Sequence, residues 1–285
     1  MILLANRYIL LTGLILINLT ASKPSANPIP VGYQLVWNEE FDIAGKPDQN
    51  RWAFEKGFVR NQELQWYQTE NAFCEKGKLI VEARRERKPN PNYQPDSRNW
   101  KENRPWIEYT SACVTTRNRV SWKYGIFEIK AKINAQNGLW PAIWFLGTFG
   151  EWPSCGEIDL MEYYRGNILA NACWGLKKRW QAQWDTGKKS LASFNETDWA
   201  IPFHLWRMEW DSQKIVLLVD GEELNTIDLS QTINKNDRGP ENPFHQPHYL
   251  LLNLAIGGRN GGDPQHTPFP SRYEIDYIRI YQKVD

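Results

Sequence analysis

Short stretches of alternating or continuous apolar residues recur along the whole chain, separated by polar turns. They are rich in Val, Ile, Tyr, Phe, Thr and Trp, the residue types that fit a pleated, half-buried surface. No amphipathic helix pattern of convincing length interrupts them. The pattern predicts β-strands at residues 33–37, 78–84, 109–116, 124–133, 139–146, 157–163, 168–174, 205–210, 214–219, 248–256 and 273–281.

Turn signals lie between the predicted strands. The clearest is "LLVDGEEL", in which Asp220 and Gly221 suit the left-handed backbone of a two-residue hairpin. The polar stretch 86–106 is expected to be a long surface loop between strands rather than a domain linker. No internal repeat is visible. The chain therefore predicts an all-β fold, most simply one sandwich of two large antiparallel sheets.

The N-terminal 26 residues are typical of a secretory signal peptide. Arg7 is followed by an apolar run over 8–19 and then by small residues and prolines. The run of about 12 residues is short for a membrane span, although an uncleaved anchor is the alternative. We expect cleavage, and a mature domain of residues 27–285 that has no membrane span and is secreted or periplasmic.

Charge and cysteine content narrow the classes of partner. The formal net charge of +1 gives no field that would attract nucleic acid or an anionic membrane, so neither partner is expected, and we expect a monomer. The spacing of the four cysteines matches no zinc site. Export permits disulfides, and buried free thiols are the alternative. These residues are Cys74, Cys113, Cys155 and Cys173.

Three carboxylates stand within the predicted strand "GEIDLMEYY". Glu157 and Asp159 are two residues apart and therefore share a face, whereas Glu162 would face the opposite side of a regular strand. A β-bulge adds one residue and restores the phase, and the adjacent apolar pair Leu160 and Met161 is where it fits. The sequence therefore predicts a bulge that turns all three acids to one face, with one of that pair in the core.

The bulged geometry suggests acid–base chemistry. Glu157 and Glu162 would be roughly 13 Å apart at Cα, and inward-leaning side chains would bring their carboxyls to roughly 5–6 Å. That is near the separation of about 5–5.5 Å found in glycosidases that retain anomeric configuration. Asp159 lies between the two, and like charges raise the pKa of at least one acid. The alternatives are a solvated strand face or a metal cage.

Tryptophan is abundant, with 15 residues, and several of these rings flank the acidic strand. Flat amphipathic rings suit stacking on flat ligands such as sugars, although each ring is equally suited to the core. The stretch "NQELQWYQ" adds amides and a carboxylate that suit sugar hydroxyl groups. The candidate substrate-binding residues are Trp140, Trp144, Trp152, Trp174, Asn61 and Glu63.

These residues carry a resemblance to a known family. "GEIDLMEYY" is similar to the bulged E-x-D-x-x-E signature of family-16 glycoside hydrolases, and "LVWNEEFD", "YTSACVTTRNRVSWKYGIFEIKAKI", "GLWPAIWFLG", "LLNLAIGG" and "EIDYIRIYQ" resemble laminarinase-type members over residues 33–283. The resemblance implies a β-jelly-roll sandwich with a concave carbohydrate-binding cleft. It implies that Glu157 is the nucleophile, Glu162 the acid/base and Asp159 the residue that tunes and orients them.

The resemblance also implies a reaction and a range of substrates. We expect a retaining endo-glycosidase acting on β-1,3-glucan or mixed-linkage β-1,3-1,4-glucan. The alternatives are an endo-β-galactosidase acting on agar-type galactan or mucin O-glycans, and a non-catalytic polysaccharide-binding protein. Cys173 stands where laminarinases often have His, and the basic segment 176–194, with Lys177, Lys178 and Arg179, is expected at the cleft rim.

No organic cofactor is expected, because two carboxylates and water complete the reaction that the resemblance implies. Many relatives carry a calcium ion on the convex side, away from the cleft. The matching positions here are Glu40, Gly77 through its carbonyl, and Asp276, with ordinary polar contacts as the alternative.

Overall fold

The computed structural model of the chain describes residues 29–194 and 198–284. The predicted signal peptide lies outside these residues. Within them the regular secondary structure is almost entirely strand, as the alternating pattern predicted, with short helical turns at Thr69–Asn71, Leu191–Ser193, Leu229–Gln231, Pro243–His245 and α1 (Gly258–Gly261). The strands are β1 (Tyr33–Glu39), β2 (Ala53–Phe54), β3 (Gln65–Tyr67), β4 (Ala72–Cys74), β5 (Leu79–Pro89), β6 (Trp106–Ser111), β7 (Cys113–Thr115), β8 (Gly125–Lys132), β9 (Leu139–Gly147), β10 (Glu157–Tyr164), β11 (Asn167–Gly175), β12 (Ala182–Ser190), β13 (His204–Trp210), β14 (Lys214–Val219), β15 (Glu222–Asp228), β16 (His248–Ile256) and β17 (Ser271–Lys283).

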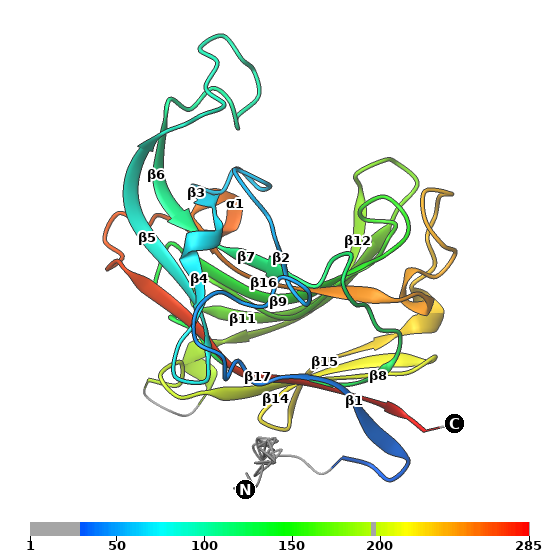
Figure 1. Cartoon of the computed structure of the whole chain (residues 1–285). Helices are drawn as coiled ribbons and strands as arrows, with labels where there is room; N and C mark the ends of the chain where they lie inside the picture. Colours follow the sequence, from blue (N-terminus) through cyan, green and yellow to red (C-terminus); the bar gives the residue numbers. More distant parts are fainter. Residues whose placement is uncertain (1–28, 195–197, 285) are drawn as a thin grey trace, which may run out of the picture.

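The described strands form two sheets that lie face to face (Figure 1). One has ten strands, in the order β15-β14-β13-β8-β17-β5-β6-β3, with β1 on β17 and β4 on β5. The other has seven, in the order β12-β11-β10-β9-β16-β7-β2. Pairing is antiparallel except between β3 and β6. Two antiparallel-dominated sheets in a sandwich confirm the predicted fold class.

The main core lies between the sheets. Alternate residues of the central strands supply it, for example Ile129 of β8, Phe145 of β9 and Leu252 of β16, each without exposed surface. β16 is buried along its whole length, so its second face needs another cover. A smaller apolar group, the cleft-floor cluster, provides it on the outer face of the seven-stranded sheet. Its buried members are Tyr67, Cys113, Ala142, Trp144, Tyr249 and Leu251.

Two sequence predictions about connections can be compared with the structure. The hairpin between β14 and β15 is confirmed, with φ of 49° at Asp220 and 85° at Gly221. The stretch 109–116, predicted as one strand, is two strands in different sheets. It divides at Ala112, where the chain crosses from β6 to β7, so an unbroken apolar pattern covers a change of sheet.

The loop 90–105 extends beyond the ends of β5 and β6 and projects from the sandwich at the side opposite β12 (Figure 1). The loop is shorter than the predicted stretch 86–106, because β5 continues to Pro89 and β6 begins at Trp106. Among the described residues, no helix has the length and apolar character needed to cross a membrane. All four cysteines are buried and unbridged, which corresponds to the free-thiol alternative.

Candidate active site

β10 carries the predicted bulge. Against β11, Asp159 pairs with Asn171 and Glu162 pairs with Leu169, so two residues of β10 lie opposite Ala170 alone. The register against β9 shifts at the same place. An unpaired extra residue reverses the side-chain phase of everything after it. Glu162 therefore returns to the face that carries Glu157 and Asp159.

The three acids line one cleft, and the residues between them do not. Leu160 and Met161 both have no exposed surface and belong to the main core. The expectation that only one of the pair would be buried is corrected, because the two bulged residues occupy the place of one and both face the second sheet. The cleft has a volume of about 780 Å³. Its lining includes Arg60, Asn61, Glu63, Trp140, Trp144, Trp152, Glu157, Asp159, Glu162, Tyr164, Asn171, Trp184, Asn253 and Asn260.

Glu157 is held by a tryptophan from the loop that precedes its strand. The indole Nε1 of Trp152 donates a hydrogen bond of 2.7 Å to Glu157 Oε2. Burial raises the pKa of Glu157 above its usual value, and the Trp152 bond and the charge of Arg60 offset only part of that rise. Glu157 also shares a side-chain hydrogen bond with Asp159, and that bond favours the charged form of Glu157. These contacts favour Glu157 as the carboxylate of the group.

Asp159 lies deeper, with 3% of its surface exposed. Its burial, followed by the charges of Glu157 and Glu162, raises the pKa of Asp159 well above its usual range. Asn171 Nδ2 donates to Asp159 Oδ2 at 3.2 Å, which opposes the rise. Asp159 is therefore the acid that keeps its proton and donates it in the hydrogen bond to Glu157.

Glu162 has its own tryptophan partner. Trp140 Nε1 donates a hydrogen bond of 2.6 Å to Glu162 Oε1. The pKa of Glu162 is raised to about 8, first by burial and then by the charges of Glu157 and Glu63, against the opposing effect of the Trp140 bond. At neutral pH Glu162 is thus mostly protonated. The cleft presents a protonated acid and a stabilised carboxylate from one strand, which is the pairing that acid-assisted displacement requires.

The other predicted residues from the 61–68 stretch lie at the wall of the cleft. Asn61 is exposed and donates through Nδ2 to Glu63 Oε1 at 3.3 Å. Glu63 is 2% exposed and accepts further bonds from Gln65 at 2.7 Å and Tyr67 at 3.4 Å. Burial raises the pKa of Glu63, and Arg60 opposes this rise. Only Asn61 of this pair presents a freely accessible side chain to a ligand.

Three of the four predicted tryptophans line the cleft. Trp140 and Trp152 hold the two glutamates, and Trp144 is mostly buried, with Nε1 donating to Asn253 Oδ1 at 2.7 Å. The guanidinium of Arg60 lies 5.0 Å from the centre of the Trp144 ring. The Arg60 side chain therefore occupies part of the surface that a sugar would otherwise use on Trp144.

The structure does not bring Trp174 into the cleft, and that expectation is corrected. In the register of β10 and β11, Cys173 pairs with Glu157, so Cys173 lies on the cleft side of its strand. Alternation sends Trp174 to the opposite side, where it is 7% exposed and packs against Phe244 in the main core.

The positions predicted for calcium do not form a set of side-chain ligands. Both carboxylate oxygens of Glu40 accept from Arg279, at 2.9 and 3.1 Å, so a guanidinium already balances this charge. Over residues 29–194 and 198–284, no three His, Cys, Asp or Glu side chains gather as metal ligands. Asp276 has other interactions, and Gly77 lies beside Asp42. Gly77 was expected to bind through its backbone carbonyl, so the calcium site stays a prediction, and no step of the proposed chemistry depends on it.

Sequence reasoning missed several residues of the cleft. Arg60 directly precedes Asn61 and was within reach of the same motif. Asn253 is a lone polar residue in the apolar run "LLLNLAI", which is a usable signal for a polar contact beneath the cleft. Asn171 and Trp184 line the cleft because of the way β10, β11 and β12 pair, and this pairing cannot be read from the sequence. Trp184, 41% exposed, comes from the segment that was expected at the rim.

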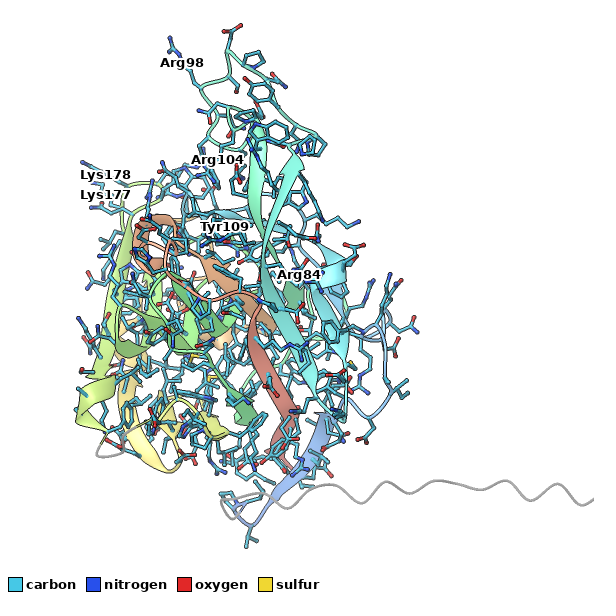
Figure 2. All side chains as sticks on the ribbon, turned by 90° about the vertical axis from the view of Figure 1, so that its left-hand side faces the viewer. Arg84, Arg98, Arg104, Tyr109, Lys177 and Lys178 are labelled. Atoms are coloured by element: carbon cyan, nitrogen blue, oxygen red, sulfur yellow. The ribbon has the colours of Figure 1, made fainter. Side chains whose placement is uncertain are left out.

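Basic side chains occur at the outer ends of both cleft walls. Figure 2 shows Arg98 on the projecting loop, with Arg104 nearer its base, and Lys177 and Lys178 at the outer edge of the other wall. Both lysines are exposed, and Arg179 forms an ion pair with Glu151. These contacts favour a solvated charge cluster at 177–179 over a ligand site.

Comparison with known proteins agrees with this site. Residues 60–279 match the sequence profile of the glycosyl hydrolases family 16. The chain is 34% identical to a β-glucanase of Rhodothermus marinus, over 89% of this chain and 86% of that protein. It is 34% identical to the catalytic domain of an endo-1,3-β-glucanase (laminarinase) of Thermotoga petrophila, with a TM-score of 0.72 over 89% of this chain and 99% of that one.

A second kind of structure is also similar. A protein solved in work on endo-acting O-glycanases, with which human gut microbiota initiate mucin breakdown, is 33% identical. Its TM-score is 0.79, over 90% of this chain and 92% of that one. The profile match, these relatives and the bulged acidic strand show that the chain belongs to the family-16 glycosyl hydrolases and is a glycoside hydrolase that acts on O-glycosyl bonds.

Proposed function

We propose that the protein is an endo-acting β-glycosidase in which Glu157 is the nucleophile and Glu162 the acid/base. One observation carries the proposal: the bulge of β10 presents both glutamates to one cleft, where the pKa of Glu162 is raised to about 8 and hydrogen bonds favour the charged form of Glu157. If Glu157 attacks the anomeric carbon directly and water then displaces it, the anomeric configuration is inverted twice and is therefore retained.

The proposed reaction has two displacement steps. Glu162 gives its proton to the glycosidic oxygen while a carboxylate oxygen of Glu157 attacks the anomeric carbon, and the bond to the leaving sugar breaks. A glycosyl ester on Glu157 results. Glu162, now ionised, takes a proton from water, whose oxygen attacks the same carbon and releases Glu157. The hydrogen bond from Asp159 stabilises Glu157 as the departing carboxylate.

The proposed substrate is a β-1,3-glucan or a mixed-linkage β-1,3-1,4-glucan. The similarity to the β-glucanase of Rhodothermus marinus and to the Thermotoga laminarinase supports it, with 34% identity in each case. That the Thermotoga relative is an endo-1,3-β-glucanase supports attack within a chain rather than at its end. The proposal also includes export through the N-terminal segment and action as a monomer without an organic cofactor.

A second candidate substrate is a β-galactose polymer such as a mucin O-glycan. The observation that favours it is the TM-score of 0.79 to the O-glycanase structure, against 0.72 for the laminarinase at nearly equal identity. The departures of this chain from the laminarinase pattern, Cys173 and the rim segment 176–194, are in agreement with it.

A substrate panel tests the proposal. The mature protein would be incubated with laminarin, lichenan, agarose and mucin, and the released oligosaccharides separated by chromatography. Glucose oligomers support the first candidate, and galactose-ended oligomers support the second. Nuclear magnetic resonance of the first product shows whether configuration is retained. Glu157→Gln is the matched control, and we expect it to lose roughly 10⁴-fold or more in rate while keeping its fold.

Binding without cleavage of any member of the panel would indicate a polysaccharide-binding protein and contradict the proposal. Normal turnover by Glu157→Gln would contradict the assignment of the nucleophile. Size-exclusion chromatography and the N-terminal sequence of the exported protein test the monomer and the signal peptide.

A further inference from the structure

A second cavity adjoins the cleft on the β16 side of the nucleophile. Its volume is about 400 Å³, roughly half that of the cleft. Leu146 and Trp152 line both cavities, so the two are neighbours across these side chains. The remaining lining comes from the segment 117–121, from residues around Gly147 and Gly150, and from Cys155 and Tyr249.

Strand register places this cavity level with the nucleophile. Glu157 pairs with Leu146 on β9, and Leu146 pairs with Tyr249 on β16, so the three form one row across the sheet. Next along, Thr115 of β7 pairs with Leu251. Because these strands are antiparallel, Arg117, two residues after Thr115, comes level with Tyr249. A chain lying across the strands through Glu157 would reach Arg117.

The charge of this cavity is positive and locally unbalanced. Arg117 and Arg119 both line it, and none of its described lining residues is acidic. The Arg117 guanidinium lies 5.7 Å from the centre of the Tyr249 ring, and no carboxylate of the described residues lines the cavity beside it. Arg119 is oriented by a hydrogen bond of 2.9 Å from its Nε to the carbonyl of Gln49.

We propose that this cavity, the arginine pocket, binds an anionic substituent of the polysaccharide, a sulfate ester or a carboxylate, next to the sugar on the nucleophile. Neutral hydroxyl groups do not require two guanidinium groups, whereas a planar fork of donors matches carboxylate and sulfate oxygens. The indole of Trp152 separates the pocket from Glu157, so the sugar backbone stays in the cleft and only its substituent enters the pocket.

This inference rests on the proposed function, since it adds a specificity site to the same cleft. Its test measures binding with Glu157→Gln, which does not consume the ligand, by titration calorimetry in 0.15 M salt. The probes are laminarin, laminarin sulfate and carboxymethyl laminarin, followed by desulfated keratan and keratan sulfate. Arg117→Gln is then combined with Glu157→Gln in a double variant. The matched control combines Glu157→Gln with Arg98→Gln, on the projecting loop (Figure 2).

We expect the sulfated or the carboxylated probe to bind about tenfold more tightly than its neutral parent. Arg117→Gln should abolish that preference and leave the neutral affinity unchanged, while Arg98→Gln should keep it. A preference for only one probe identifies the anion. Equal affinity for charged and neutral probes overturns the arginine pocket alone. So does a preference that survives Arg117→Gln, or one that is lost in Arg98→Gln as well as in Arg117→Gln. Failure of every polysaccharide to bind overturns the proposed function as well.

Discussion

The indole Nε1 of Trp140 lies 2.6 Å from Oε1 of Glu162 and donates to it, and Trp152 stands in the same relation to Glu157 at 2.7 Å. Both rings were expected to stack on sugars, but their polar edges are bonded to the reacting acids. Because each bond stabilises the charged form of its acid, the two tryptophans help to set the proton states of the pair.

Replacing Trp140 should move the alkaline limb of the pH profile. Glu162 must be protonated to act as the acid, so kcat/KM should fall as the pH rises through about 8. Trp140→Phe removes a donor to the carboxylate, and the pKa of Glu162 should rise by roughly one unit. The limb then moves to higher pH in profiles measured on laminarin. Trp184→Phe, on the same cleft, is the control and should leave the limb unmoved.

The corresponding change at the nucleophile should act on the acidic limb. Glu157 must be ionised to attack, and its hydrogen bond from Trp152 favours that form. Trp152→Phe should raise the pKa of Glu157, so activity would be lost at a higher pH as the solution is acidified, by roughly one unit. A variant whose acidic limb stays in place while kcat/KM falls uniformly would mean that Trp152 acts only in sugar binding.

Glu162 should make the protein less stable at alkaline pH. Its pKa is raised from 4.5 in the unfolded chain to about 8, so the folded state holds the proton more tightly. The stabilisation is fully present below pH 4.5 and is lost as the pH rises through 8. Glu162→Gln removes this dependence. As the pH rises from 5 to 9, the Tm of the variant should increase relative to that of the wild type. The increase should be roughly 3–5 °C for each unit by which the pKa of Glu162 differs between the folded and unfolded chain.

Differential scanning calorimetry at several pH values checks this expectation. Glu108→Gln is a suitable control, since Glu108 is 54% exposed in its ion pair with Arg87. Its Tm difference from the wild type should be nearly independent of pH. A Glu162→Gln variant that shows an equally flat difference would contradict the raised pKa.

Local sequence predicted the elements whose cause is local. The bulge was predictable because Leu160 and Met161 are adjacent and apolar, and because a regular strand would turn Glu162 away from Glu157 and Asp159. The hairpin at Asp220 and Gly221 was predictable because its backbone conformation is a property of those two residues. In both cases the physical constraint lies within a few residues of the chain.

Features that depend on register were not predictable in this way. Trp174 was assigned to the wrong face because its orientation follows from the pairing of Cys173 with Glu157 on another strand. Asn171 joins the site through the same pairing. The break at Ala112, between β6 and β7, arises because the two halves of one apolar run find partners in different sheets. A single sequence carries no direct record of such long-range choices.

Arg104 should determine how firmly the projecting loop is attached to the cleft wall. Its guanidinium donates to the carbonyl of Glu63 at 2.8 Å and to that of Gln62 at 3.1 Å. It also lies 5.1 Å from the ring centre of Phe58, on the cleft-wall segment, and 4.9 Å from that of Trp100, on the projecting loop. The one side chain thus joins the loop to the short segment of backbone that carries Asn61 and Glu63, which both line the cleft.

Arg104→Ala should release this attachment at a cost of about 1–3 kcal/mol in the free energy of unfolding. Proteinase K should then cut within residues 90–105 faster than in the wild type, and KM should rise because the backbone at Gln62 and Glu63 loses its anchor while the glutamates of β10 keep theirs. Arg98→Ala, farther out on the same loop, should change neither quantity (Figure 2). If Arg104→Ala cut no faster than Arg98→Ala, the loop would be held by its own turns, and the guanidinium contacts would not be what attaches it to the wall.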